Sequence, residues 1–198
     1  MNTYNKWMQH AGRGILVLLL IALAIPSSAQ KEIQEYYQIR VYHFSDLSQQ
    51  TAAEQYLSSD FVPAMHKNGF KNIGVFTPVG NDTAADKKIY VFMAASSLEK
   101  IVQPSLYAGK DTAGAYTGAA FDKIPYLRFE TVLLKAFPLA KKMNLPKLSS
   151  PKSEHVYELR SYESPTEKYY KSKVKMFNQG GEIALFSRLN FNAVFYSD

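Results

Sequence analysis

Apolar and polar residues alternate along residues 36–44 (YYQIRVYHF), and the same alternation returns in residues 156–164 (VYELRSYES). Alternation with period two is typical of a β-strand with one buried face. A constant offset of 120 residues relates the two stretches and matches Tyr37, Arg40 and Tyr42 with Tyr157, Arg160 and Tyr162. The pattern therefore predicts two related strands.

The residues after the first stretch predict a helix followed by two strands. Residues 51–54 (TAAE) form a capping box, which predicts a helix start, and Gly69 is expected to end this helix. Pro63 lacks an N–H and is expected to bend the helix axis. Residues 72–77 predict a second strand, and the unbroken apolar run at residues 89–95 predicts a central third strand.

A second helix and a fourth strand complete the first unit. Residues 96–99 (SSLE) are expected to cap a helix, and the small residues of segment 109–120 predict a partly helical stretch. Residues 126–137 form the longest predicted strand. The resulting order, β-α-β-β-α-β, is that of a ferredoxin-like unit and predicts an α+β fold for residues 33–137.

A second, partial copy of this unit is predicted at residues 154–198. Residues 138–153 contain the prolines, lysines and serines of an exposed linker. Residues 155–163 then predict a strand, residues 164–167 (SPTE) a capping box, and the offset of 120 persists as far as Asn192. One offset that preserves a strand, a helical stripe and a second strand around Asn192 indicates a structural repeat. The second unit is expected to be incomplete, because nothing corresponds to the third and fourth strands.

Side-chain alternation predicts a polar face on each sheet. In the first strand Arg40 and Tyr42 lie opposite Ile39 and Val41. If the apolar faces pack on helices, the polar faces of the two units meet and enclose a barrel cavity. The expected ligand-binding residues of this cavity are Arg40, Tyr42, Arg128, Glu130, Glu158, Arg160 and Tyr162.

The N-terminal residues 1–29 predict a signal peptide. Lys6 and Arg13 precede an apolar run of eleven residues, 15–25, and small residues follow it. Eleven residues are too few to span a hydrocarbon core of about 30 Å. The prediction is export to the periplasm of a Gram-negative bacterium or secretion, with no membrane span after cleavage before Gln30. An uncleaved anchor is the alternative.

Composition narrows the possible chemistry. Without Lys6 and Arg13 the chain has 21 basic and 17 acidic residues, a net charge of +4, and the bases are spread along it, which argues against a nucleic-acid surface. Cysteine is absent, so no thiolate can act as nucleophile or ligand. The sequence contains no Gly-rich phosphate loop with a following lysine, no His-Glu-x-x-His motif and no paired-cysteine zinc spacing.

The paired strand motifs, segment 69–76 (GFKNIGVF) and segment 126–134 (YLRFETVLL) resemble the NIPSNAP family over residues 35–198. The resemblance implies tandem ferredoxin-like units of the dimeric α/β-barrel superfamily. That superfamily also contains haem-degrading and quinone-forming monooxygenases. The resemblance therefore implies the fold more directly than it implies an activity.

Three functions are compatible with these patterns. In the first, the barrel binds a small acidic or aromatic ligand, with Arg40 and Arg160 as anion clamps; alternatively these arginines only pair with Glu130 or Glu158. In the second, the protein is a haem-degrading or cofactor-free monooxygenase, with haem as the cofactor in the former case. His66 is the catalytic candidate, although it could simply cap its helix or be solvated. In the third, the sheet faces serve for self-association. Ligand binding without a cofactor or metal is the favoured interpretation.

Overall fold

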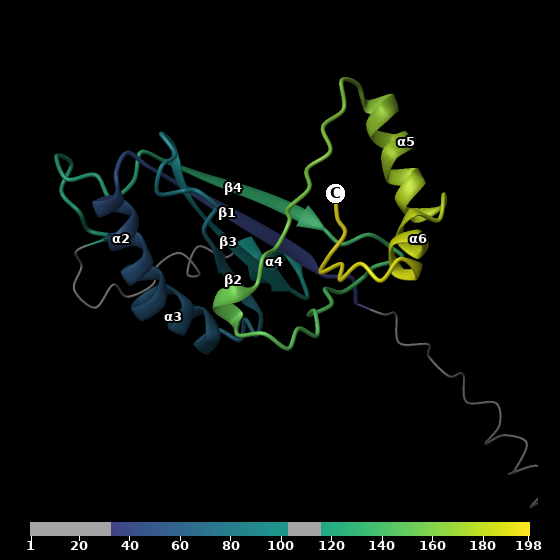
Figure 1. Ribbon diagram of the computed structural model, residues 1–198, viewed down its shortest axis with the longest axis horizontal. Coiled ribbons are helices and arrows are strands. Elements are labelled where there is room, and N and C mark those ends of the chain that lie inside the picture. The colour runs from purple at the N-terminus through teal and green to yellow at the C-terminus, as the bar shows by residue number, and fades with distance from the viewer. Residues whose placement is uncertain (1–32, 103–115) are drawn as a thin grey trace, which may run out of the picture. The chain divides into compact units, whose positions relative to one another are not determined.

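Four antiparallel strands form the sheet of this α+β protein, in the order β2-β3-β1-β4 (Figure 1). The computed structural model describes residues 33–102 and 116–198. The predicted signal peptide and most of the small-residue segment 109–120 lie outside the described residues. The strands are β1 (Tyr36–Phe44), β2 (Ile73–Phe76), β3 (Lys87–Ala95) and β4 (Arg128–Lys135).

The predicted strands of the first unit are all present. The central position of β3 is confirmed, since it pairs with both β1 and β2, and Ile89, Val91 and Met93 are fully buried. Residues 126–137 are not the longest strand, because β4 has eight residues whereas β1 and β3 have nine each. β4 is shorter because it pairs with β1 only from Arg128 to Lys135.

The first helical stretch is continuous but irregular. It consists of α2 (Leu47–Tyr56), a π-helical segment (Leu57–Phe61) and α3 (Val62–Lys67). The predicted start at the capping box was wrong, because the Asp46 side chain accepts a hydrogen bond from the Gln49 N–H at 2.9 Å and begins the helix earlier. Pro63 is the second residue of α3, two positions after the π segment ends at Phe61. A prolyl nitrogen cannot donate within the helix, which accounts for the irregularity at this place.

Gly69 ends this helical stretch, as predicted. Its φ angle of 80° lies in the left-handed region, which glycine enters without steric cost. The Phe70 N–H donates to the Met65 carbonyl at 3.0 Å, which satisfies one of the last carbonyls of the helix. The predicted cap at residues 96–99 is also confirmed, since the Ser97 hydroxyl accepts from the Lys100 N–H at the start of α4 (Leu98–Val102).

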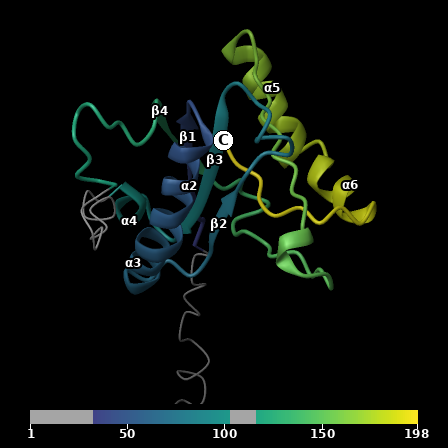
Figure 2. The same ribbon diagram turned by 60° about the vertical axis from the view of Figure 1, so that its left-hand side comes forward.

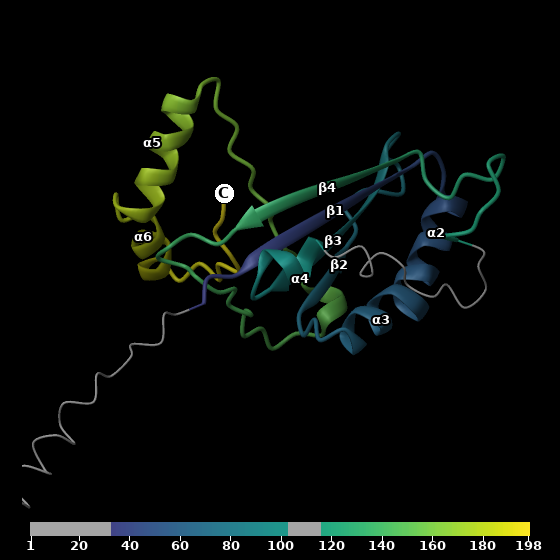
Figure 3. The same ribbon diagram turned by 180° about the vertical axis from the view of Figure 1, so that it is seen from behind.

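Helices α2, α3 and α4 cover one face of the sheet (Figure 2). Seen from behind, α4 lies against strands β1 and β3 (Figure 3). The core on this side is built from large side chains with almost no exposed surface: Phe44, Leu57, Phe61, Met65, Phe70, Ile89, Met93 and Ile101. The sheet is therefore the middle layer between these helices and the rest of the chain.

The C-terminal third contains helices but no regular strand. Helix α5 (Glu167–Asn178) is capped by Thr166 rather than by Ser164, so its predicted start was two residues too early. Helix α6 (Glu182–Arg188) and a short 3₁₀ turn (Lys152–Glu154) complete the secondary structure. No helix in the described ranges has both the length and the apolar character that a membrane span requires.

The two strands predicted for the second copy do not form as strands. Residues 155–163 are extended, but they pair with no strand in the described part of the chain. Near the C-terminus the pairing is limited to an isolated bridge between Ala136 and Ser197. A strand depends on a hydrogen-bonded neighbour, so the alternating sequence at residues 155–163 yields only an extended backbone here.

The connection at residues 138–153 is mostly exposed, yet it is anchored. The Glu35 N–H donates to the Lys141 carbonyl at 2.8 Å, and the Met143 N–H donates to the Glu35 carboxylate at 2.7 Å. The Asn144 N–H reaches the Val194 carbonyl at 2.7 Å. The predicted linker therefore runs beside the start of β1 and the C-terminal segment, and it holds both in place.

Buried tyrosines are expected to make the fold sensitive to alkali. Burial raises the pKa of Tyr37 and of Tyr116 well above the usual value of about 10. In the folded state both side chains stay protonated at a pH where tyrosine in the unfolded chain already ionises. The stability that they contribute is therefore complete below about pH 10 and is lost as the pH rises further. We expect tyrosinate absorbance to rise in two stages, the second coinciding with loss of the helical circular dichroism signal. A single stage in a protein that stays folded would contradict this expectation.

Candidate functional site

A cleft of about 610 Å³ lies on the sheet face opposite helices α2, α3 and α4. Its floor is formed by apolar side chains of three strands, because the register places residues of the same face side by side: Ile39 pairs with Val132, and Val41 pairs with Tyr90. Leu134 extends the floor along β4. The floor therefore consists of the apolar side chains that alternation predicted on one face of β1, together with those beside them on β3 and β4.

Aromatic side chains of the C-terminal third form the walls. The Phe195 ring lies 5.1 Å from that of Tyr37 and 4.8 Å from that of Phe92 (centroid distances), which fastens the C-terminal segment to the sheet. The Phe177 ring of α5 lies 5.7 Å from those of Tyr162 and Tyr196. These rings bury apolar area and offer flat faces to a ligand.

The segment at residues 156–163, here called the strap, supplies the charged groups of one wall. The Arg160 guanidinium donates from Nε and Nη2 to both carboxylate oxygens of Glu158, at 2.9 Å each. These hydrogen bonds hold the pKa of the Glu158 carboxyl below its usual value. A guanidinium has five N–H donors, so a ligand carboxylate can still accept hydrogen bonds from Arg160.

Helix α5 adds a second cation to the cleft. The Lys173 ammonium lies 4.4 Å from the Tyr162 ring centroid and 3.4 Å from the Glu182 carboxylate. The Tyr170 hydroxyl donates to the Asp198 carboxylate at 2.9 Å. Sequence reasoning missed Lys173 and Asp198, because neither belongs to the repeated strand motif. Helical spacing could have placed Lys173 beside Phe177, since residues four apart share a helix face.

Three predicted ligand-binding residues line this cleft and four do not. Glu158, Arg160 and Tyr162 are among its lining residues. Arg40 and Tyr42 lie on the other face of β1, beneath the helices, and each has at most 5% of its surface exposed. The expectation that the faces bearing Arg40 and Arg160 meet in a shared cavity was therefore wrong.

The environment of Arg40 explains why it faces the helices. Its Cζ lies 4.8 Å from the Phe61 ring centroid and 5.7 Å from that of Phe129, and its Nε donates to the Gln38 side chain at 2.8 Å. Ring faces and a polar neighbour compensate part of the cost of burying a guanidinium. Because Ile39 and Val41 on the opposite face are also buried, the polarity of one residue did not reveal which face packs on the helices.

Arg128 and Glu130 belong to an ionic network at one end of the sheet. His43 contacts Asp86 through Nδ1 at 2.9 Å and Glu130 through Nε2 at 3.0 Å, Arg128 contacts Glu130, and Lys88 reaches Asp86 at 3.2 Å. The register sets Glu130 opposite Val41, so the alternative pairing of Arg40 with Glu130 was wrong. The alternative pairing of Arg160 with Glu158 is observed.

His66 lies outside the cleft. It is exposed on α3, and its Nδ1 is 2.8 Å from the Phe70 carbonyl, where the protonated nitrogen donates to the backbone beyond the helix end. The described residues contain no cluster of three or more His, Asp or Glu side chains able to hold a metal ion. Haem ligation by His66 thus stays a prediction made from the resemblance alone.

No protein-family model, curated protein or solved structure matches this chain.

Proposed function

We propose that this protein binds a small ligand with an aromatic or otherwise apolar body and an acidic group in the cleft. The observation that supports the proposal best is the combination of an apolar floor and aromatic walls with Arg160 and Lys173 on one side. Ligand sites typically combine a mostly apolar concave surface with a few convergent polar groups. The floor would hold the ligand body, and the cations would orient its acidic end.

The proposal extends to the architecture and the compartment. The sheet order β2-β3-β1-β4, with a helical connection before β2 and another in the segment before β4, supports a ferredoxin-like first unit. The repeated strand motif, and helix α5 that follows its second copy as α2 follows β1, support a related second unit of the NIPSNAP type. Export is proposed from the N-terminal sequence. In this interpretation the protein is a ligand-binding protein outside the cytoplasm.

An anionic aromatic probe tests the proposal directly. 1-Anilinonaphthalene-8-sulfonate is expected to bind the purified chain and to become fluorescent. Arg160→Ala should weaken this binding by roughly tenfold to a hundredfold, since one charge-assisted hydrogen bond contributes roughly 1.5–3 kcal/mol. Leu134→Arg, which places a charge on the floor, should abolish binding of an uncharged probe, N-phenyl-1-naphthylamine.

Comparing the two probes separates charge from packing. Arg160→Ala should leave binding of the uncharged probe unchanged, and Lys67→Ala, on α3 at the opposite face of the sheet, should affect neither probe. If Leu134→Arg leaves the binding of both probes unchanged while the protein stays folded, the cleft is not the binding site and the proposal fails.

A further inference from the structure

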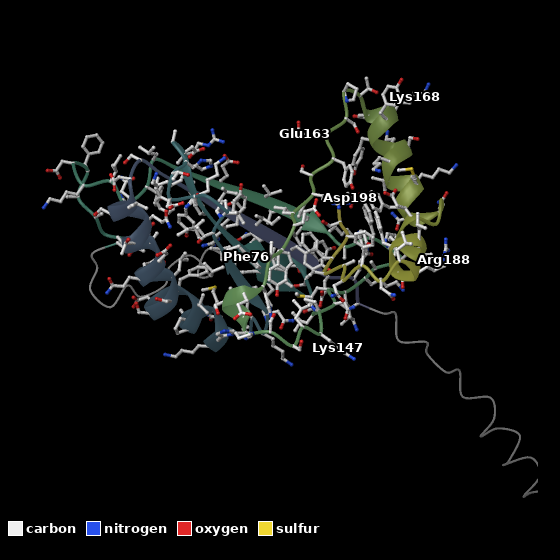
Figure 4. The ribbon with its side chains drawn as sticks, in the orientation of Figure 1. Phe76, Lys147, Glu163, Lys168, Arg188 and Asp198 are labelled. Atoms are coloured by element: carbon white, nitrogen blue, oxygen red, sulfur yellow. The ribbon has the colours of Figure 1, made fainter. Side chains whose placement is uncertain are left out.

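The strap is an extended segment with free edges. Its residues are exposed throughout, with 79% of Val156 and 54% of Leu159 accessible to solvent. No backbone hydrogen bond joins residues 156–163 to another segment of the described chain. Tyr157 contacts Phe76 of β2 at one end, and Glu163 leads toward α5 at the other (Figure 4).

Such a segment resembles an unprotected edge strand. A row of free N–H and C=O groups with alternating apolar side chains is a template for pairing with another strand. Proteins that avoid such pairing place prolines or bulges along the edge, and residues 156–163 contain neither proline nor glycine. Within the described residues neither edge of the strap pairs with another segment, whereas β4 is occupied on one side by β1.

The charge pattern of the strap identifies the strand that fits it. We propose that the strap pairs with the strap of a second copy of this chain, antiparallel and centred on Leu159. In this register Glu158 of each copy lies opposite Arg160 of the other. Because the interface has twofold symmetry, the complementary pair is formed twice. Directly opposite side chains in an antiparallel pair have Cβ atoms about 4.5–5.5 Å apart, close enough for these charges to interact.

The flanking positions agree with the same register. Val156 lies opposite Tyr162, an apolar–aromatic pair, and His155 lies opposite Glu163, a second complementary pair. A register centred on Arg160 or on Glu158 would instead set like charges against each other. No other antiparallel self-pairing places Glu158 opposite Arg160, so the register is specific.

Dimerisation through the strap does not require a ligand in the cleft. The strap lines the cleft through Glu158, Arg160 and Tyr162. Pairing would therefore hold this wall in place by backbone hydrogen bonds to the second copy.

Charge reversal tests the pairing. The purified chain is expected to sediment as a dimer, and Glu158→Arg or Arg160→Glu should each weaken dimerisation by roughly tenfold or more, because like charges then face each other twice. Mixing the two variants should restore a heterodimer, in which each reversed charge meets its opposite. The ion pair within each chain stays broken in the mixture, so recovery on mixing can only come from contacts between chains.

Cysteine cross-linking tests the register. Because the chain has no cysteine, Leu159→Cys introduces a single thiol that lies opposite its own symmetry mate. The Cα distance across such a pair, about 4.5–5.5 Å, permits a disulfide. Leu159→Cys should cross-link efficiently on mild oxidation, whereas Val156→Cys, an equally accessible control, should not. A monomeric chain, a dimer that charge reversal leaves intact, or equal cross-linking of both variants would each overturn the inference.

Discussion

Phe61→Ala is expected to lower the free energy of unfolding by about 3–5 kcal/mol, the range for truncating a fully buried phenylalanine. Phe61 has no exposed surface and lies where the π-helical segment joins α3. Its ring contacts Tyr56 and supports the Arg40 guanidinium, so truncation removes packing and also uncovers a buried cation. Chemical denaturation followed by circular dichroism measures the effect.

Phe121 provides the matched control for this experiment. The same substitution there removes the same atoms from a side chain that is 98% exposed, and the free energy of unfolding should change by no more than about 0.5 kcal/mol. Equal effects of Phe61→Ala and Phe121→Ala would show that the helices do not pack on the sheet as described.

Arg40→Ala is expected to cost about 2–4 kcal/mol of stability, since it leaves a cavity between the sheet and the helices and removes the hydrogen bond to Gln38. Arg40→Met fills a similar volume without charge and should retain more of the stability. Binding of the anionic probe should be unchanged in Arg40→Met, because Arg40 does not line the cleft. Denaturation curves and probe titrations on the same samples measure both quantities.

Arg160→Ala should show the opposite behaviour. The Arg160 side chain is 45% exposed and pairs with Glu158 of the same strap, so its loss should hardly change the free energy of unfolding. Binding of the anionic probe should weaken. If Arg40→Met loses probe binding and Arg160→Ala does not, the ligand binds on the sheet face that carries Arg40. That result would refute binding in the cleft.

The strands of the first unit, the end of the helix at Gly69 and the cap at Ser97 could be predicted because their signals are local. Period-two alternation, a glycine that enters the left-handed region and a serine before a helical run all act within a few residues. Alternation also set Glu158, Arg160 and Tyr162 apart from Tyr157, Leu159 and Ser161, but residues of both sets line the cleft.

The facing of β1 and the pairing of the strap depend on distant residues. Alternation separates the side chains of β1 into two sets, but it does not say which set faces the helices when both are buried. Phe61 and Phe129, which lie far from Arg40 in the sequence, cover its guanidinium and so stabilise Arg40 on the helix side of the sheet. Likewise, the alternating pattern of the strap predicts a strand, but a strand forms only where the fold or a second chain supplies a neighbour for its backbone.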